Sequence, residues 1–131
     1  MPKRILVADT SDSDRRLSAI LTGQDVMFAR TMGEAQRLLA QQQFDLVMIG
    51  VHFDDSQMFD LVRAIRADDF QNEVPIVCVR GTPGYTVVST STLESALKVL
   101  AADTFVDLLH FAQEHSGNAA LRAAVQRYLK E

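Results

Sequence analysis

Short apolar runs alternate with amphipathic segments along this chain, and this alternation limits its fold more than any other feature. Residues 5–8, 46–49 and 76–79 are continuously apolar and include β-branched side chains. Such runs are typical of parallel strands that are buried on both faces. Between and after them, apolar residues recur at intervals of three and four, which indicates helices with one buried face. The clearest of these residues are Met58, Leu61, Val62 and Ile65, then Leu93, Ala96, Leu97 and Leu100, and finally Leu121, Ala124, Val125 and Tyr128.

Weaker signals complete the alternation of strands and helices. Residues 25–30 and 104–108 have strand character, and residues 17–21 have a short helical pattern. Capping boxes at 31–34 and 91–94 are predicted to begin the second and fourth helices. A strand followed by a helix, five times over, predicts an α/β fold in which helices cover both faces of a parallel sheet.

The composition restricts the kind of protein. A chain of 131 residues that is 47% hydrophobic is expected to form a single domain, residues 1–131. The net charge of -4 and the lack of a basic stripe argue against a nucleic-acid partner. No apolar run reaches the roughly 20 residues that cross a membrane. The single cysteine, Cys78, is expected to pack as a small apolar side chain, and the cytoplasm is the expected compartment.

Three segments resemble response-regulator receiver domains. KRILVADTSDSDRRLSAIL, FDLVMI and VPIVCV are similar to the first, third and fourth strands of that family with their flanking residues. The resemblance implies a flavodoxin-like three-layer sandwich with strand order 2-1-3-4-5. It also implies a switch in which an aspartate ending the third strand takes a phosphoryl group and an acidic pair after the first strand holds Mg²⁺. A hydroxyl ending the fourth strand and a lysine ending the fifth then respond to the phosphoryl charge.

The chain departs from the family at the positions that carry this chemistry. The acidic pair falls on Asp9 and Thr10, and the phosphoacceptor falls on Gly50. The hydroxyl position falls on Arg80, and the lysine position falls near Leu108. Phosphoryl transfer needs an acceptor and positioned charge, and Mg²⁺ prefers several oxygen ligands. We therefore predict a pseudo-receiver that uses no metal and no cofactor.

Nearby acidic residues offer two interpretations. Asp54 and Asp55 follow the third strand, four or five residues after the acceptor position. The interpretation we favour is that they cap the next helix together with Ser56. The alternative is an atypical receiver that is phosphorylated, or binds a metal, through Asp54 or Asp55. With Asp9 and Asp12, these carboxylates could form an acidic rim that holds a divalent cation weakly.

Arg80 is an unusual residue at the end of a buried strand, because a guanidinium there needs a partner. The ends of the first, third and fourth strands line one crevice in this fold. We therefore expect Arg80 to pair with Asp9 across the space that Gly50 leaves, although an Arg80 that bends into solvent stays an alternative.

An enzyme is the third possibility. His52 beside Asp54 and Asp55 has the composition of a general base with its orienting carboxylate. No convincing nucleophile accompanies them, so we do not expect catalysis. His110 and His115 are scattered and predict no metal site.

A long segment between the fourth strand and the following helix, residues 81–92, carries Tyr85, Val87 and Val88 among small polar residues. It is either an interaction loop or an insertion that lies back on the sheet edge. We expect a receiver-like signalling module that is not phosphorylated and acts through contact with a protein partner. A homodimer through the last helix and a small ligand in the crevice stay open.

Overall fold

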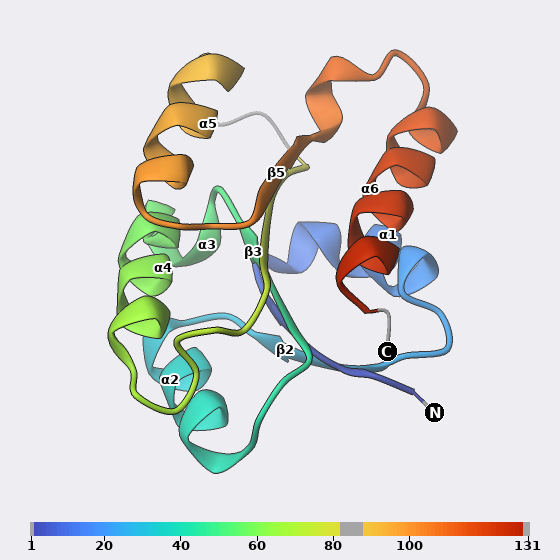
Figure 1. Ribbon diagram of the computed structural model, residues 1–131. Coiled ribbons are helices and arrows are strands. Elements are labelled where there is room, and N and C mark those ends of the chain that lie inside the picture. The colour runs from blue at the N-terminus through green and yellow to red at the C-terminus, as the bar shows by residue number, and fades with distance from the viewer. Residues whose placement is uncertain (1, 82–87, 130–131) are drawn as a thin grey trace.

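The computed structural model describes residues 2–81 and 88–129. Strands and helices alternate along the chain, as the apolar pattern predicted (Figure 1). In chain order the elements are β1 (Arg4–Ala8), η1 (Ser11–Ser13), α1 (Asp14–Ile20), β2 (Asp25–Ala29), α2 (Met32–Gln41), β3 (Leu46–Gly50), α3 (Phe53–Ser56), α4 (Met58–Ala67), β4 (Ile76–Arg80), α5 (Thr90–Val99), β5 (Thr104–Asp107), η2 (Leu108–His110) and α6 (Glu114–Tyr128).

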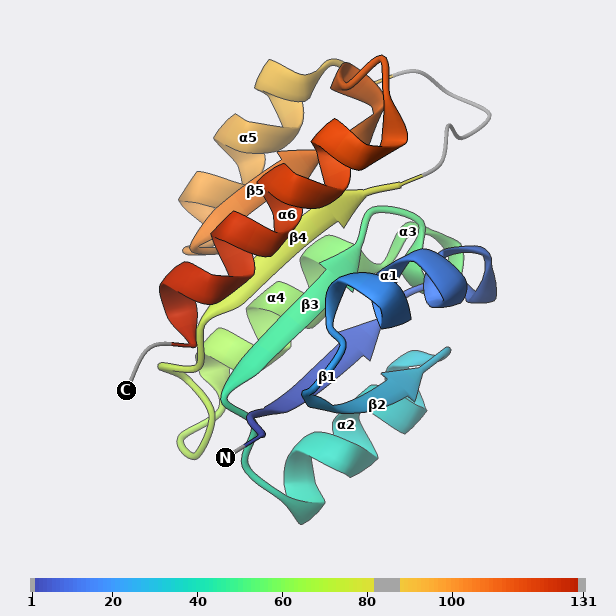
Figure 2. The same cartoon turned by 90° about the vertical axis from the view of Figure 1, so that its right-hand side faces the viewer.

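The five strands form one parallel sheet in the order β2-β1-β3-β4-β5. The predicted α/β architecture and strand order are confirmed. Figure 2 shows the sheet between two layers of helices. Because all strands run the same way, the carboxyl ends of β1, β3, β4 and β5 meet at one edge of the sheet, where this topology places ligand sites.

Alternate residues of each strand supply the two halves of the core. One face of the sheet packs against α2, α3, α4 and α5 through residues such as Leu6, Ile49 and Cys78. The other face packs against α1 and α6 through residues such as Val7 and Val79. Cys78 is fully buried, as expected, and burial raises the pKa of its thiol to about 12.

The last helix buries the predicted stripe. Leu121, Ala124 and Val125 are buried, and Tyr128 packs against the same cluster. The helical stripe of α4 is likewise buried. No helix among the described residues is long and apolar enough to cross a membrane.

The structure confirms the helix start predicted from one capping box and contradicts the start predicted from the other. The Thr31 side chain accepts a hydrogen bond from the Glu34 N–H (3.1 Å), so α2 begins as predicted. The fourth predicted helix, α5, begins earlier than the box at 91–94, because Ser89 supplies the cap by accepting from the Thr92 N–H (3.2 Å). The predicted start at 91–94 was therefore wrong, because the N-cap is Ser89 and not Ser91.

Candidate functional site

The carboxylate of Asp9 occupies the space at the end of β3. Ala8 pairs with Ile49 in the sheet, so the next residues of the two strands, Asp9 and Gly50, are neighbours. A Cβ atom on Gly50 would lie 2.0 Å from both Cγ and Oδ1 of Asp9 and 2.3 Å from Oδ2. Real Cβ contacts are essentially never so short, so a side chain at position 50 would require the Asp9 carboxylate to move. The space that the sequence analysis left open for Arg80 is filled by Asp9.

Asp9 is buried, with only 4% of its surface exposed. Its Oδ1 accepts a hydrogen bond from the Thr10 N–H at 2.7 Å. Burial raises the pKa of Asp9 above its ordinary value, and hydrogen bonds from Thr10 and Ser13 with charge interactions from His52 and Arg30 offset only part of that effect. Asp9 is therefore a carboxyl group that is costly to ionise.

Arg30 supplies the cation beside Asp9. Its Nη1 donates to the Asp9 carbonyl at 3.0 Å, its Nη2 forms an ion pair with Asp14, and its guanidinium lies 5.2 Å from the centre of the Phe28 ring. The sequence pattern did not point to this residue. Its one signal was an arginine placed directly after an apolar strand, the same signal that drew attention to Arg80.

Arg80 does not pair with Asp9, and that prediction was wrong. Arg80 forms a bidentate pair with Asp107, at 3.2 Å from Nε to Oδ1 and 2.5 Å from Nη2 to Oδ2. The two side chains are only 10% and 2% exposed. Arg80 Nη1 also donates to the Val88 carbonyl at 2.6 Å. The guanidinium thus does not bend into solvent either, and its partner is a carboxylate that the sequence analysis overlooked.

The direction of each side chain explains the error. Val79 faces α1 and α6, so the next residue, Arg80, faces the opposite side of the sheet, where α5 lies. Asp9 follows Ala8, which faces α2 and α4, and so lies on the α1 side. Arg80 pairs in register with Asp107 on β5, and side chains in register point to the same face. The useful signal was Asp107, the only charged residue in the strand run at 104–107.

Asp107 gathers donors from three elements. Thr90 Oγ1 donates to its Oδ2 (2.7 Å), and the Leu109 N–H donates to its Oδ1 (3.0 Å). Burial raises the pKa of Asp107, but the hydrogen bonds from Arg80, Thr90 and Leu109 outweigh burial and hold that pKa below its ordinary value. His110 Nε2 lies 2.5 Å from Thr90 Oγ1 and so extends the network to the surface.

The position that the resemblance assigned to a lysine is apolar and buried. Leu108 follows the end of β5 and packs in the cluster beneath α1 and α6. It offers no charge to the crevice. Among the residues that the structure describes, the buried cation at this end of the sheet is Arg80, which already has its own carboxylate.

Asp54 and Asp55 do not cap the helix that follows them, so that interpretation was wrong. Asp54 Oδ2 accepts from the Met32 N–H (2.8 Å), the first residue of α2. The N-cap residues of α3 and α4 are His52 and Gln57, and neither side chain accepts a capping hydrogen bond from its helix. Asp54, Asp55 and Ser56 all have positive φ, at 42°, 56° and 66°. This left-handed turn directs Asp54 toward α2 and away from its own helix.

The predicted acidic rim does not assemble as a cluster. Asp12 and Asp55 are exposed, while Asp9 is buried and Asp54 is engaged with α2. Within residues 2–81 and 88–129, no group of three or more His, Cys, Asp or Glu side chains could hold a metal ion. Of the predicted interaction loop, Tyr85 and Val87 lie outside the described residues. Val88 is half-buried and accepts from Arg80.

Comparison with solved structures identifies the fold. The chain superposes on the phosphorylated cyanobacterial phytochrome response regulator RcpA with a TM-score of 0.80, at 15% identity over 99% of this chain and 96% of that one. It matches a response regulator from Hahella chejuensis with a TM-score of 0.79, at 19% identity over 98% and 96% of the two chains. It also matches the chemotaxis response regulator CheY4 of Vibrio cholerae with a TM-score of 0.74, at 20% identity over 98% and 99%.

These likenesses establish the flavodoxin-like fold of response-regulator receivers along nearly the whole chain. At such low identity they do not establish an activity. No protein-family model and no curated protein matches the chain by sequence.

Proposed function

We propose that this chain is a receiver-fold signalling module that is not phosphorylated and works through contact with a protein partner. One observation carries the proposal: the carboxylate of Asp9 fills the space at Gly50 in which an acceptor side chain would begin. The RcpA structure is that of a phosphorylated protein, so the same fold can carry a phosphoryl group in another protein. Here the strand end that corresponds to the acceptor has no side chain.

The surrounding charges support the same conclusion. A phosphoryl group and a metal ion need unpaired carboxylates and cations directed at them. Asp9 is buried, burial raises its pKa, and its Oδ1 is already engaged by the Thr10 N–H. Arg80 and Asp107 are paired with each other, on the face of the sheet opposite to Asp9. What such a domain can still offer is a surface of fixed shape, and therefore a binding function.

Phosphodonors provide the test. The chain is incubated with acetyl phosphate and Mg²⁺, and separately with beryllofluoride and Mg²⁺, and is followed by intact-mass spectrometry and by ¹⁵N NMR. We expect no added phosphoryl group and no shift at Asp9, Gly50 or Arg80. A receiver domain that retains the third-strand aspartate serves as the positive control.

Phosphorylation elsewhere would point to the alternative functions. One phosphoryl group per chain that is lost in Asp54→Asn or Asp55→Asn would overturn the proposal in favour of an atypical receiver. A hydrolytic activity that requires His52 would favour an enzyme, although Asp54 is already directed to the Met32 N–H. The cytoplasmic location stays a prediction.

A further inference from the structure

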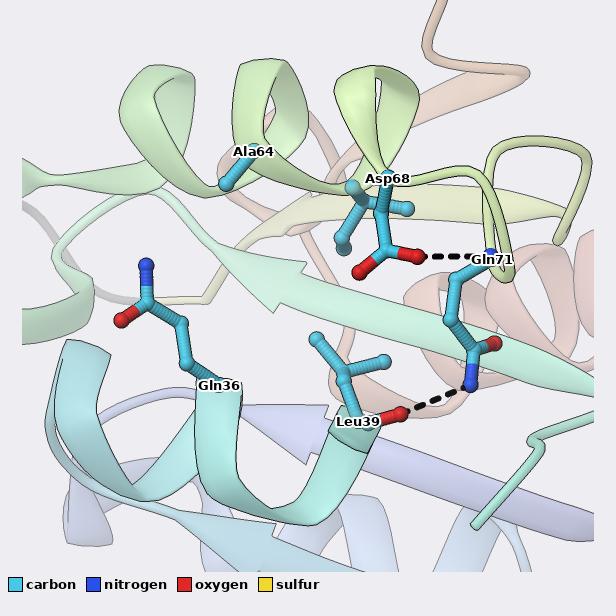
Figure 3. Close-up of a pocket in the computed structure, with 6 residues that line it drawn as sticks. Gln36, Leu39, Ala64, Asp68 and Gln71 are labelled. Carbon is cyan, nitrogen blue, oxygen red and sulfur yellow. Dashed lines mark hydrogen bonds between the residues drawn. The ribbon is translucent and has the colours of Figure 1, made fainter. Parts of the chain in front are cut away.

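A hollow lies between α2 and α4, next to the segment that follows α4. Its volume is about 240 Å³. Figure 3 shows the hollow with side chains from both helices and from the segment after α4 around it. The lining residues are Gln36, Leu39, Ala64, Ile65, Asp68 and Gln71.

The size of the hollow indicates what it can hold. Sites for small molecules and cofactors occupy roughly 300–1,000 Å³ and enclose most of the ligand. This hollow is smaller and open to solvent, so it fits one amino-acid side chain better than a cofactor.

The chemistry of the lining suits a long side chain with a charged end. Leu39 and Ile65 are buried and form an apolar floor. Asp68 is fixed because its Oδ1 accepts from the N–H groups of Phe70 (2.7 Å) and Gln71 (3.2 Å). Its second oxygen points into the hollow in Figure 3 and has no hydrogen-bond partner among the described residues. The Gln71 Nε2 is already engaged by two carbonyls, those of Leu39 (3.0 Å) and Gln42 (2.9 Å).

On its side of the hollow, the segment after α4 favours a cation. Residues 68–73 contain Asp68, Asp69 and Glu73 and no Lys, Arg or His. The neighbouring Arg66 does not neutralise them, because its guanidinium donates to three backbone carbonyls and to the carboxylate of Asp103. A lysine or arginine stem can lie on apolar surface while its charged end reaches a carboxylate.

An exposed aromatic ring in the segment after α4 favours a protein over a free cation. Phe70, whose N–H holds Asp68, leaves 63% of its surface exposed. Aromatic residues are enriched in the contact surfaces of protein complexes. An exposed ring in the same segment as Asp68 matches a partner that brings both a basic side chain and an apolar neighbour.

We propose that the hollow between α2 and α4 receives a lysine or arginine side chain of a partner protein, with the stem on Leu39 and Ile65 and the cation on Asp68. This inference rests on the proposed function, because it assigns the chemistry of the partner that the module contacts.

Short peptides test the inference. The ¹⁵N-labelled chain is titrated with acetylated Ala-Arg-Ala amide, with its lysine analogue, and with a norleucine analogue that keeps the stem and lacks the charge. We expect saturable shifts at Leu39, Ala64 and Asp68 with the two basic peptides. Asp68→Asn keeps the acceptor for the backbone N–H groups, removes the charge and should weaken basic-peptide binding about fivefold.

Glu73→Gln is the matched control, since it removes one charge from the same segment outside the hollow. It should change the affinity less than about twofold, because an exposed charge at a distance is screened. Equal binding of the norleucine peptide, an equal loss in both variants, or no shift at the hollow would each overturn the inference.

The same samples separate this inference from the proposed function. A chain that acetyl phosphate phosphorylates but that binds the basic peptides at Asp68 overturns the proposed function alone. A chain that stays unmodified and binds all three peptides equally overturns the inference alone.

Discussion

At the residue scale, Gly50 and Asp9 share one space at the end of β3. We expect Gly50→Ala to destabilise the protein by about 1–3 kcal/mol, because the added Cβ would lie 2.0 Å from the Asp9 carboxylate. The measurement is the free energy of unfolding in urea. Gly33→Ala is the control: Gly33 is the second residue of α2, and a Cβ there meets only the Thr31 Oγ1, at 3.9 Å, so this substitution should not destabilise the protein. An unchanged stability of Gly50→Ala would contradict the packing of Asp9 described above.

Asp9 also gives a prediction about pH. Its pKa is raised in the folded protein, so the folded state holds the proton more tightly than the unfolded chain. This tighter binding of the proton stabilises the folded state at low pH, and the contribution is lost as pH rises through the pKa of Asp9 in the folded protein. We expect Asp9→Asn, which keeps the acceptor for the Thr10 N–H, to be more stable than wild type at pH 7. The difference should vanish below about pH 4, near the ordinary pKa of an aspartate.

Urea unfolding across this pH range checks the effect of Asp9. Asp69→Asn changes the same charge at an exposed position and should show no comparable gain at neutral pH. A wild type at least as stable as Asp9→Asn at pH 7 would show that Arg30 and the hydrogen bonds outweigh burial.

At the scale of elements, one buried ion pair joins β4, β5 and α5 through Arg80, Asp107 and Thr90. We expect Arg80→Met and Asp107→Leu each to destabilise the protein by about 3–5 kcal/mol, because each leaves an unpaired buried charge. The double variant should lose less than either single variant, since two apolar side chains can replace the pair. A double-mutant cycle of urea unfolding measures this coupling.

The control for that cycle is an exposed ion pair on α4. Arg63 Nη1 lies 2.9 Å from Asp60 Oδ1, and both side chains are well exposed. Their coupling should be no more than about 1 kcal/mol. If the losses of protein stability in Arg80→Met and Asp107→Leu were additive in the double variant, the two side chains would not be energetically coupled.

At the scale of the whole molecule, the parallel sheet separates two chemical environments at one edge. Asp9 and Gly50 belong to the side covered by α1 and α6, and Arg80 and Asp107 belong to the side covered by α5. A cation on one side is therefore not available to a carboxylate on the other. This separation supports a module in which Arg80 and Asp107 are already paired with each other within the fold.

The sequence predicted the architecture well because burial follows apolar spacing. Continuous runs such as residues 46–49 become central strands, and the stripe at Leu121 and Val125 becomes the buried face of α6. The lack of a carboxylate at Gly50 was also visible in the sequence. The partner of Arg80 was not predicted, although alternation from Val79 indicates the face on which it lies.

The sequence by itself determined the order of strands and helices, the buried faces and the residue at each strand end, because these follow from local apolar periodicity together with the family resemblance. Only the tertiary structure decided that Asp9 fills the space at Gly50, that Arg80 pairs with Asp107, and that Asp54 caps α2. These contacts depend on the register between strands and on which face each side chain takes. Both are fixed when segments far apart in the chain pack together, as for Arg80 and Asp107, which are separated by 27 positions.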